Sequence, residues 1–291
     1  MSSGLISLTS AEIADRVNQQ RLFGIDSLRE SLFNFCKVFL DAQDSDLQKI
    51  QELSLSPSVL LYGVPNTGKT TLCYLLFQQL KKEVNNEINF YSVDVGRMLD
   101  PSLGQSSRNL EAIFDELKAV SGFVFLVLDE LDAFCMSRSR TQEHDAIRRA
   151  MTTLMLELDK LNYAKDNNIL IFGITNVKEL LDTAVVRRFS LKQEMQPTLD
   201  KDSFEKFVKY LNDLIDYKIE KKVIEELYNL YQNRQMTAGD VKNIYKEIYI
   251  DSVSGKLNNN EDISDKTISL FKERFSTGEH LAKTKEELAN S

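Results

Sequence analysis

The alternation of apolar and polar positions divides the chain, up to about residue 195, into short apolar runs and longer amphipathic stretches. Five runs rich in apolar and β-branched residues predict strands, and stretches of helical spacing separate them. The predicted strands are residues 58–63, 89–95, 123–130, 169–176 and, with a weaker pattern, 190–195. Strands that alternate with helices pair in parallel and are covered on both faces. The pattern therefore predicts an α/β fold around a five-stranded parallel sheet.

Two of these runs predict the centre of the sheet. Residues 123–128 (FVFLVL) and 169–174 (ILIFGI) are apolar without alternation, which is typical of strands buried on both faces and not of an exposed edge. In an open parallel sheet, ligands bind beyond the carboxyl ends of the strands. We therefore expect functional residues directly after these two runs.

The strand pattern ends at Pro197, and the chain that follows is helical. Residues 204–215, 223–231 and 238–253 carry apolar residues at helical spacing, as do residues 26–40 near the start of the chain. The change near residue 198 is the predicted domain boundary. The predicted organisation is a short N-terminal segment (1–20), an α/β nucleotide-binding domain (21–198), a small all-helical lid domain (199–277) and a charged, flexible tail (278–291).

A phosphate-binding motif follows the first predicted strand. Residues 63–70, GVPNTGKT, fit the pattern G-x-x-x-x-G-K-[ST] between an apolar strand and a helix. The glycines let the backbone fold around phosphate oxygens, the N–H groups at the helix start attract an anion, and the lysine reaches the terminal phosphates. An ordinary glycine turn is the alternative, but it does not account for the lysine and the helix start. The predicted ATP contacts are Gly63, Val64, Pro65, Asn66, Thr67, Gly68, Lys69, Thr70 and Thr71.

Polar residues end both central strands. Asp129 and Glu130 follow one, and Asn176 follows the other. Asp129 and the hydroxyl of Thr70 are predicted to bind Mg²⁺, while Glu130 polarises the attacking water and the Asn176 amide orients it. Taken alone, two acids at a strand end are as well explained as solvated residues, and asparagine is a common turn former. Together with the phosphate loop, they predict the second half of an ATPase site.

Composition and charge narrow the class of protein. The chain of 291 residues is 42% hydrophobic and 27% charged, with a formal net charge of −8, which predicts a folded protein and disfavours nucleic acid as a partner. An uninterrupted apolar run of about 18 residues and a secretory signal are both missing, so we expect a soluble cytoplasmic protein without a membrane partner. Cys36, Cys73 and Cys135 lie far apart in apolar runs, which indicates buried thiols in a reducing compartment.

Further motifs resemble those of the AAA ATPases within the AAA+ superfamily, of the meiotic-clade and proteasomal type, over residues 21 to about 250. RLFGIDSLRESL resembles the family's entry segment, LDELDAFCMSRS its extended second carboxylate motif, LLDTAVVRRF its arginine-finger stretch and TAGDV its lid segment near the ribose. SLGQSSRNLEAIFDEL resembles a family helix that usually has an acid at the position of Gln105. The strings GKTTLC and DAIRR are similar to those of family members that remodel HORMA-domain proteins.

The resemblance implies roles that spacing alone does not. Gly24 would lie by the adenine and Gly239 by the ribose. Arg187 and Arg188 would reach the ATP of a neighbouring copy, so the active form would be an ATP-dependent homo-oligomeric ring, usually a hexamer. A solvated basic pair after a helix is the alternative for the two arginines.

Besides Gln105, the chain departs from the family at the predicted pore-facing loop. Ser102 stands where protein-threading members carry an aromatic residue that grips substrate in the central pore, and Leu103 is the apolar residue that remains. We therefore expect ATP hydrolysis coupled to remodelling of a partner protein, without a prediction of processive threading. The alternative is a nucleotide-controlled scaffold in which ATP binding assembles a complex and slow hydrolysis resets it. A DNA-loading role is disfavoured by the acidic composition.

Overall fold

The computed structural model describes residues 4–84, 87–95, 105–134, 141–163, 168–257 and 259–289. The chain forms two compact units. The first comprises Met1–Arg21, Ser27–Gly63 and Lys69–Glu194, and the second comprises Leu22–Asp26, Val64–Gly68 and Met195–Ser291. The long second part thus begins at Met195, whereas the sequence pattern placed the boundary near residue 198. The segments Leu22–Asp26 and Val64–Gly68 also belong to the second unit, which the hydrophobic pattern along the chain does not reveal.

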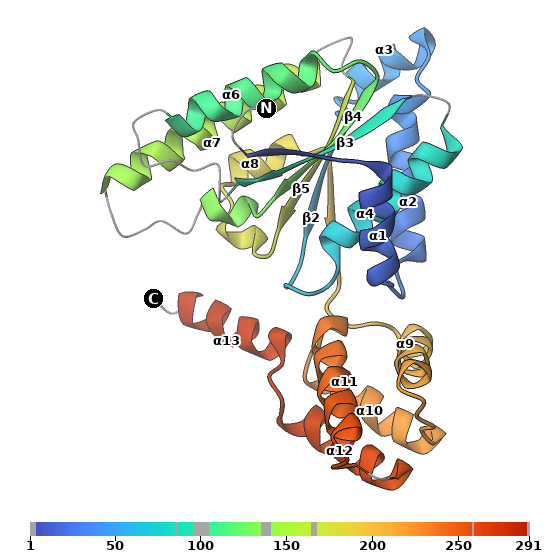
Figure 1. The fold of residues 1–291 in the computed structure, drawn as a ribbon. Helices are drawn as coiled ribbons and strands as arrows, with labels where there is room; N and C mark the ends of the chain where they lie inside the picture. The colour runs from blue at the N-terminus through green and yellow to red at the C-terminus, as the bar shows by residue number, and fades with distance from the viewer. Residues whose placement is uncertain are drawn as a thin grey trace. The chain divides into compact units, whose positions relative to one another are not determined.

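The first unit is built on a six-stranded sheet with the order β1-β3-β4-β5-β2-β6 (Figure 1). Five strands pair in parallel, and each lies within one or two residues of its predicted bounds, which confirms the predicted parallel sheet. The two continuous apolar runs are β4 and β5, and both are central. The parallel strands are β2 (Ser58–Tyr62), β3 (Ile88–Asp94), β4 (Phe123–Asp129), β5 (Ile169–Thr175) and β6 (Leu191–Glu194).

The sheet has a sixth strand that the sequence pattern did not predict. β1 (Leu5–Leu8) pairs antiparallel with β3, so that Leu5 lies opposite Val93 and Leu8 opposite Phe90. Its two end residues are buried and its two middle residues are exposed. A four-residue run without regular alternation carries little signal of its own. Its pairing with the exposed edge of β3 makes it a strand, and part of the predicted N-terminal segment belongs to the sheet.

Helices cover both faces of this sheet. Figure 1 shows α1, α2 and α4 on one side and α6, α7 and α8 on the other. Successive residues of a strand point to opposite faces, so Val124 and Leu126 join the core under α6 and α7, while Phe125 stacks with Phe90 and Phe172 and meets Phe77 of α4. The helices are α1 (Ser10–Gln19), α2 (Asp26–Leu40), α3 (Asp44–Glu52), α4 (Lys69–Glu83), α6 (Gln105–Lys118), α7 (Thr141–Tyr163) and α8 (Thr183–Arg188), with short 3₁₀ turns at Leu131–Phe134 and Lys178–Leu180.

The second unit is helical around its own core. Phe204, Phe207, Leu227, Tyr231 and Phe271 are among its fully buried side chains. Its helices are α9 (Lys201–Leu214), α10 (Lys221–Asn233), α11 (Ala238–Val253), α12 (Asn260–Glu273) and α13 (Thr277–Ala289). The predicted all-helical domain is therefore present.

The predicted flexible tail differs from the structure. Residues 278–289 belong to helix α13, which begins at Thr277. The sequence of this helix is charged and weakly patterned, so periodicity gave no reason to expect it. Its first turn is instead fixed by hydrogen bonds to α10 and α11, described below.

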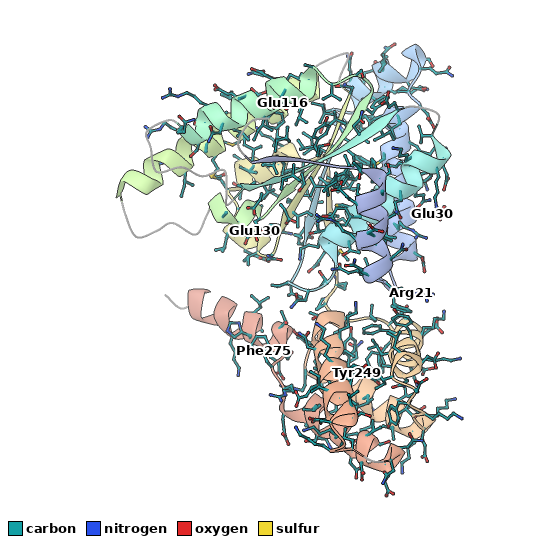
Figure 2. All side chains as sticks on the ribbon, in the orientation of Figure 1. Arg21, Glu30, Glu116, Glu130, Tyr249 and Phe275 are labelled. Carbon is teal, nitrogen blue, oxygen red and sulfur yellow. The ribbon has the colours of Figure 1, made fainter. Side chains whose placement is uncertain are left out.

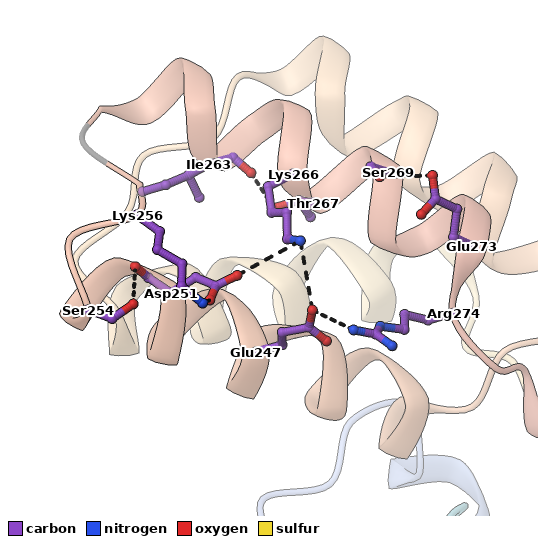
Figure 3. A network of polar contacts seen from close by, with 10 residues as sticks. All are labelled: Glu247, Asp251, Ser254, Lys256, Ile263, Lys266, Thr267, Ser269, Glu273 and Arg274. Atoms are coloured by element: carbon purple, nitrogen blue, oxygen red, sulfur yellow. Dashed lines mark hydrogen bonds and ion pairs between the residues drawn. The ribbon is translucent and has the colours of Figure 1, made fainter.

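Ion pairs hold α11 against α12 on the surface of the helical unit (Figure 3). Arg274 donates to Glu247 at 2.6 Å, and Lys266 lies 3.8 Å from both Glu247 and Asp251. Lys256 closes the network on Asp251 at 2.9 Å. Because several of these groups are exposed to solvent, which screens their charges, the network contributes little to stability. Across the described residues, none of the helices is both long enough and apolar enough to span a membrane.

Candidate active site

Lys69 is a buried lysine at the first residue of α4. Its side chain is 5% exposed, and its ammonium donates to the carbonyl of Gly63 at 2.7 Å. Burial lowers the pKa of Lys69 from 10.5 to about 8, against the opposing charges of Asp129 and Asp132. The backbone of Gly63, at φ 140°, bends so that its carbonyl faces the lysine. The lysine is therefore held at the mouth of the phosphate loop with two carboxylates close by.

Thr70 and Asp129 meet at the carboxyl end of β4. The Thr70 hydroxyl donates to Asp129 Oδ2 at 2.9 Å, and Asp129 Oδ1 accepts the Glu130 N–H at 2.9 Å. A hydroxyl beside a single carboxylate fits Mg²⁺, which takes one or two protein oxygens and completes its octahedron with water and phosphate. Three-residue clusters of metal-binding side chains are absent from the described residues. The donor set thus suits a nucleotide-bound cation better than a dedicated metal centre.

Glu130 occupies a strained and accessible position. Its φ is 59°, in the left-handed region that non-glycine residues rarely adopt, and its side chain is exposed. Figure 2 shows it on the turn that follows β4. Strain of this kind costs on the order of 1–3 kcal/mol and persists where the surroundings determine the conformation. The turn carries Glu130 past the buried strand, next to Asp129.

Asp132 joins this turn to the end of β5 and was not given a role in the sequence analysis. Its Oδ1 accepts the Thr175 hydroxyl at 3.0 Å and the Asn176 N–H at 3.1 Å. Asn176 itself is half-buried. One carboxylate therefore fixes the backbone of the predicted water-orienting residue relative to Glu130. The spacing D-E-x-D in the sequence was the available signal.

The middle of the phosphate loop belongs to the second unit, where it is closely packed. The Thr67 hydroxyl donates to the Val64 carbonyl at 3.0 Å. Asn66 has φ 64° and Gly68 has φ 92°, so the loop makes a left-handed turn at both. A Cβ at Gly68 would lie 2.6 Å from Leu22 Cδ2. A side chain at residue 68 would therefore displace Leu22 and be strained by the positive φ. Pro65 lies between Val64 and Asn66.

Three other predicted contact residues have different surroundings. A Cβ at Gly239 would lie 2.5 Å from Asn66 Cβ, so this glycine packs directly against the phosphate loop. Gly24 has φ 67° and approaches Ser203, where a Cβ would lie 3.0 Å from the hydroxyl oxygen. The Thr71 hydroxyl donates to the Gln20 side chain. The Thr71 side chain is therefore engaged by Gln20, which leaves its backbone N–H as its means of contacting phosphate.

The two arginines at the end of α8 differ sharply. Arg188 is bidentate on Asp159 of α7 at 2.8 and 2.9 Å and also donates to the Ala184 carbonyl at 2.9 Å. Arg187 is exposed, and among the described residues it has neither a hydrogen bond nor an ion pair. The structure thus ties one guanidinium within its own chain and presents the other to solvent.

The middle part of the chain matches the sequence model of a known family. The sequence model of the ATPase family associated with various cellular activities (AAA) matches residues 59–197, which contain the whole cluster from the phosphate loop to the arginine pair. The chain therefore contains an AAA domain over these residues. AAA proteins as a family are ATPases.

Several AAA relatives are similar to this chain over part of their length. Spastin of Xenopus laevis is 30% identical over 171 residues, which are 52% of this chain and 27% of spastin. Pachytene checkpoint protein 2 of Saccharomyces cerevisiae is 30% identical over 198 residues, 58% of this chain and 35% of that protein. An AAA ATPase forming ring-shaped complexes from Corynebacterium glutamicum is 25% identical over 217 residues, 72% and 40% of the two chains. The chain thus spans less than half the length of each.

Solved AAA structures share the fold. A chain in the structure of the E. coli MS115-1 HORMA:CdnC:Trip13 complex superposes with a TM-score of 0.72 at 19% identity, over 94% of this chain and 95% of that one. The FIGL-1 AAA domain in complex with ADP superposes with a TM-score of 0.62 at 18% identity, over 91% and 86% of the two chains. Both similarities concern the fold of the AAA domain.

Ser102 and Leu103, at the predicted pore-facing loop, lie outside the described residues. Gln105, in the place of the usual acid, begins α6 and donates to the Asn109 side chain at 2.7 Å. Cys36 and Cys73 are free and buried, as predicted, while Cys135 lies outside the described residues.

Proposed function

We propose that this chain is the ATPase subunit of a homo-oligomeric ring, a hexamer by family resemblance, and that ATP turnover changes the conformation of a bound partner protein. The observation that carries the proposal is the cluster at the end of β4. Lys69 donates to the Gly63 carbonyl, Thr70 donates to Asp129, and Asp129 accepts the N–H of Glu130. These are the residue types that phosphoryl transfer requires. The match to a family of ATPases supports the same conclusion.

Binding begins at the phosphate loop. The backbone N–H groups of residues 63–71, except at Pro65, which has none, donate to the phosphate oxygens. Lys69 exchanges its bond to the Gly63 carbonyl for the terminal phosphates, and its burial strengthens this attraction. Mg²⁺ bound with the nucleotide would offset negative charge on the phosphates. Thr70 and Asp129 would hold it.

Hydrolysis uses the residues after the two central strands. Glu130 takes a proton from the attacking water, and its exposed position allows that water to approach. Asn176 orients the water through its amide, and Asp132 holds the Asn176 backbone in place. Gly24 and Gly239 would face the adenine and the ribose, as the resemblance implies.

We assign different roles to Arg187 and Arg188. Arg187 is exposed without an intrachain partner among the described residues, so we assign it to the ATP of the neighbouring copy, where it stabilises charge in the transition state. Arg188 is engaged by Asp159, so we assign it to the alignment of α8 on α7. Hydrolysis would then depend on assembly.

The test combines rate and assembly. ATPase rate per subunit is measured against protein concentration, with mass photometry on the same samples. We expect the rate to rise as rings form, Lys69→Ala to lose nucleotide binding, and Glu130→Gln to bind ATP, hydrolyse it at least about 10²-fold more slowly and accumulate rings. Glu111→Gln, an exposed carboxylate on α6, is the matched control and should behave as the parent. Parent-level hydrolysis by Glu130→Gln would falsify the assignment of the base. Rings of wild type that bind ATP but barely hydrolyse it would point to the scaffold function instead.

For the partner, we propose a HORMA-domain protein. The fold matches, over nearly the whole chain, a protein solved in complex with a HORMA protein, and the strings GKTTLC and DAIRR resemble those of HORMA remodellers. Purified HORMA-domain proteins are incubated with Glu130→Gln and ATP, and complexes are separated by size. Retention of a HORMA protein, but not of a folded protein without that domain, supports the proposal. Equal retention of both, or of neither, contradicts it.

A further inference from the structure

Asp240 is a buried carboxylate in the first turn of α11, and it binds two helix starts at once. It is 5% exposed. Its Oδ2 accepts the N–H of Thr237, the N-cap of α11, at 2.9 Å. The same oxygen accepts the Thr277 N–H at 3.1 Å, and Oδ1 accepts the Thr277 hydroxyl at 2.6 Å. Thr277 is the first residue of α13, so one carboxylate caps both helices.

The rest of the first turn of α13 is fixed to the same region. Arg234, which ends α10, is bidentate on Glu279 at 3.1 and 2.8 Å. A Cβ at Gly278 would overlap the Gln235 carbonyl oxygen, so the two backbones touch. Beyond this turn, α13 runs away from the other helices of its unit (Figure 1). The position of α13 is thus set by its first turn.

The opposite side of the α11 turn touches the phosphate loop. Gly239, the neighbour of Asp240, lies so close to Asn66 that a Cβ would be 2.5 Å from Asn66 Cβ and 3.1 Å from its carbonyl oxygen. Asn66 holds a left-handed φ of 64°. A continuous series of contacts therefore runs from Thr277 through Asp240 and Gly239 to Asn66, all within the second unit.

We propose that Asp240 and Thr277 are positioning residues for nucleotide binding: the first turn of α13 holds the start of α11 against Asn66 and so sets the shape of the phosphate loop. The proposal rests on the proposed ATP binding. Neither residue touches the nucleotide; both act through Gly239. A helix that periodicity predicts to be a frayed tail thereby contributes to affinity.

The first test compares two threonines. Thr277→Val removes the hydroxyl bond to a charged partner, and we expect a fluorescent ADP analogue to bind about tenfold more weakly. Thr267→Val is the matched control, because Thr267 is also buried in the second unit but donates to the Ile263 carbonyl within α12 (Figure 3), at 2.7 Å. Thr267→Val should lower the unfolding free energy by a similar amount and leave the affinity for the ADP analogue unchanged. Thr277→Ser should restore binding. Equal affinities of Thr277→Val and Thr267→Val would overturn the proposal.

The second test uses the fact that coupling between nucleotide binding and the first turn of α13 must act in both directions. If the α13 turn raises nucleotide affinity, nucleotide must stabilise that turn by the same factor. Amide hydrogen exchange at residues 277–280 of the full chain should slow by about tenfold with saturating ADP, and this protection should vanish in Thr277→Val. Unchanged exchange with ADP bound would contradict the coupling. Lys69→Ala distinguishes failure of the proposed phosphate site from failure of the α13 coupling. If Lys69→Ala binds ADP normally, the proposed phosphate site is wrong. If Lys69→Ala loses ADP binding but Thr277→Val has no effect, only the α13 coupling is refuted.

Discussion

The end of β4 and the end of α8 are two polar regions of the same unit that differ in how far one chain completes them. At β4, Lys69, Thr70 and Asp129 all have partners within the chain. At α8, Arg188 is engaged by Asp159, but Arg187 is exposed and has no hydrogen bond or ion pair among the described residues. The residues proposed to bind nucleotide are thus positioned within a single chain. The exposed guanidinium of Arg187 can instead contact a second copy of the chain.

The largest effect is expected from the exposed arginine. Arg187→Ala should lower the ATPase rate of assembled protein by about 10³ to 10⁵, since an arginine supplied to the transition state is worth that much in related systems. Nucleotide affinity of the isolated chain should stay unchanged. Lys192→Ala removes another exposed cation of the same unit and serves as the control. A rate for Arg187→Ala within twofold of the control would remove Arg187 from the site.

A smaller loss is expected where Asp132 supports Asn176. Asp132→Ala removes the acceptor of both the Thr175 hydroxyl and the Asn176 N–H, and bonds to a charged group are worth about 1.5–3 kcal/mol. We expect kcat to fall about ten- to hundredfold with little change in KM. Thr175→Val breaks one of the two bonds and should give an intermediate kcat. An equal rise in KM instead would indicate a damaged binding loop.

The lowered pKa of Lys69 predicts that the affinity for ATP depends on pH. With the pKa of Lys69 near 8, the ammonium is present below pH 8 and is lost above it. ATP needs the charged form, so affinity should be constant up to about pH 7.5 and about tenfold weaker at pH 9. Binding near pH 8 should take up protons, which calorimetry in buffers of different ionisation enthalpy detects. Because the unfolded lysine retains a pKa of 10.5, this group also makes unfolding free energy rise with pH between 8 and 10.5. Affinity that is flat to pH 9.5 would contradict the assignment.

The smallest effect concerns the second arginine. Asp159→Ala and Arg188→Ala should each lower the unfolding free energy by about 1 kcal/mol, because the pair is about one third exposed and partly screened. The double variant should cost little more than either single one. Both should slow ATP hydrolysis far less than Arg187→Ala. If Arg188→Ala matched Arg187→Ala in rate while Asp159→Ala did not, Arg188 would itself act on a neighbouring ATP.

Prediction from sequence succeeded where a local pattern carries the information. The five parallel strands follow from apolar runs, and the loop between β2 and α4 follows from spaced glycines before a helix. The pattern failed for β1 and α13. β1 has four residues and is a strand because β3 offers an unpaired edge. α13 is tied down at its start by Asp240 and Arg234, residues far away in sequence.

By itself, the sequence determined the fold class, the family motifs and the types of residue available for ATP chemistry, because backbone geometry and side-chain chemistry are local properties. The tertiary structure decided which of these residues act together. It placed Asp132 under Asn176, gave Lys69 a buried site with a lowered pKa, and distinguished Arg187 from Arg188 by a carboxylate on another helix. Such differences depend on burial and on partners distant along the chain, and those exist only once the chain has folded.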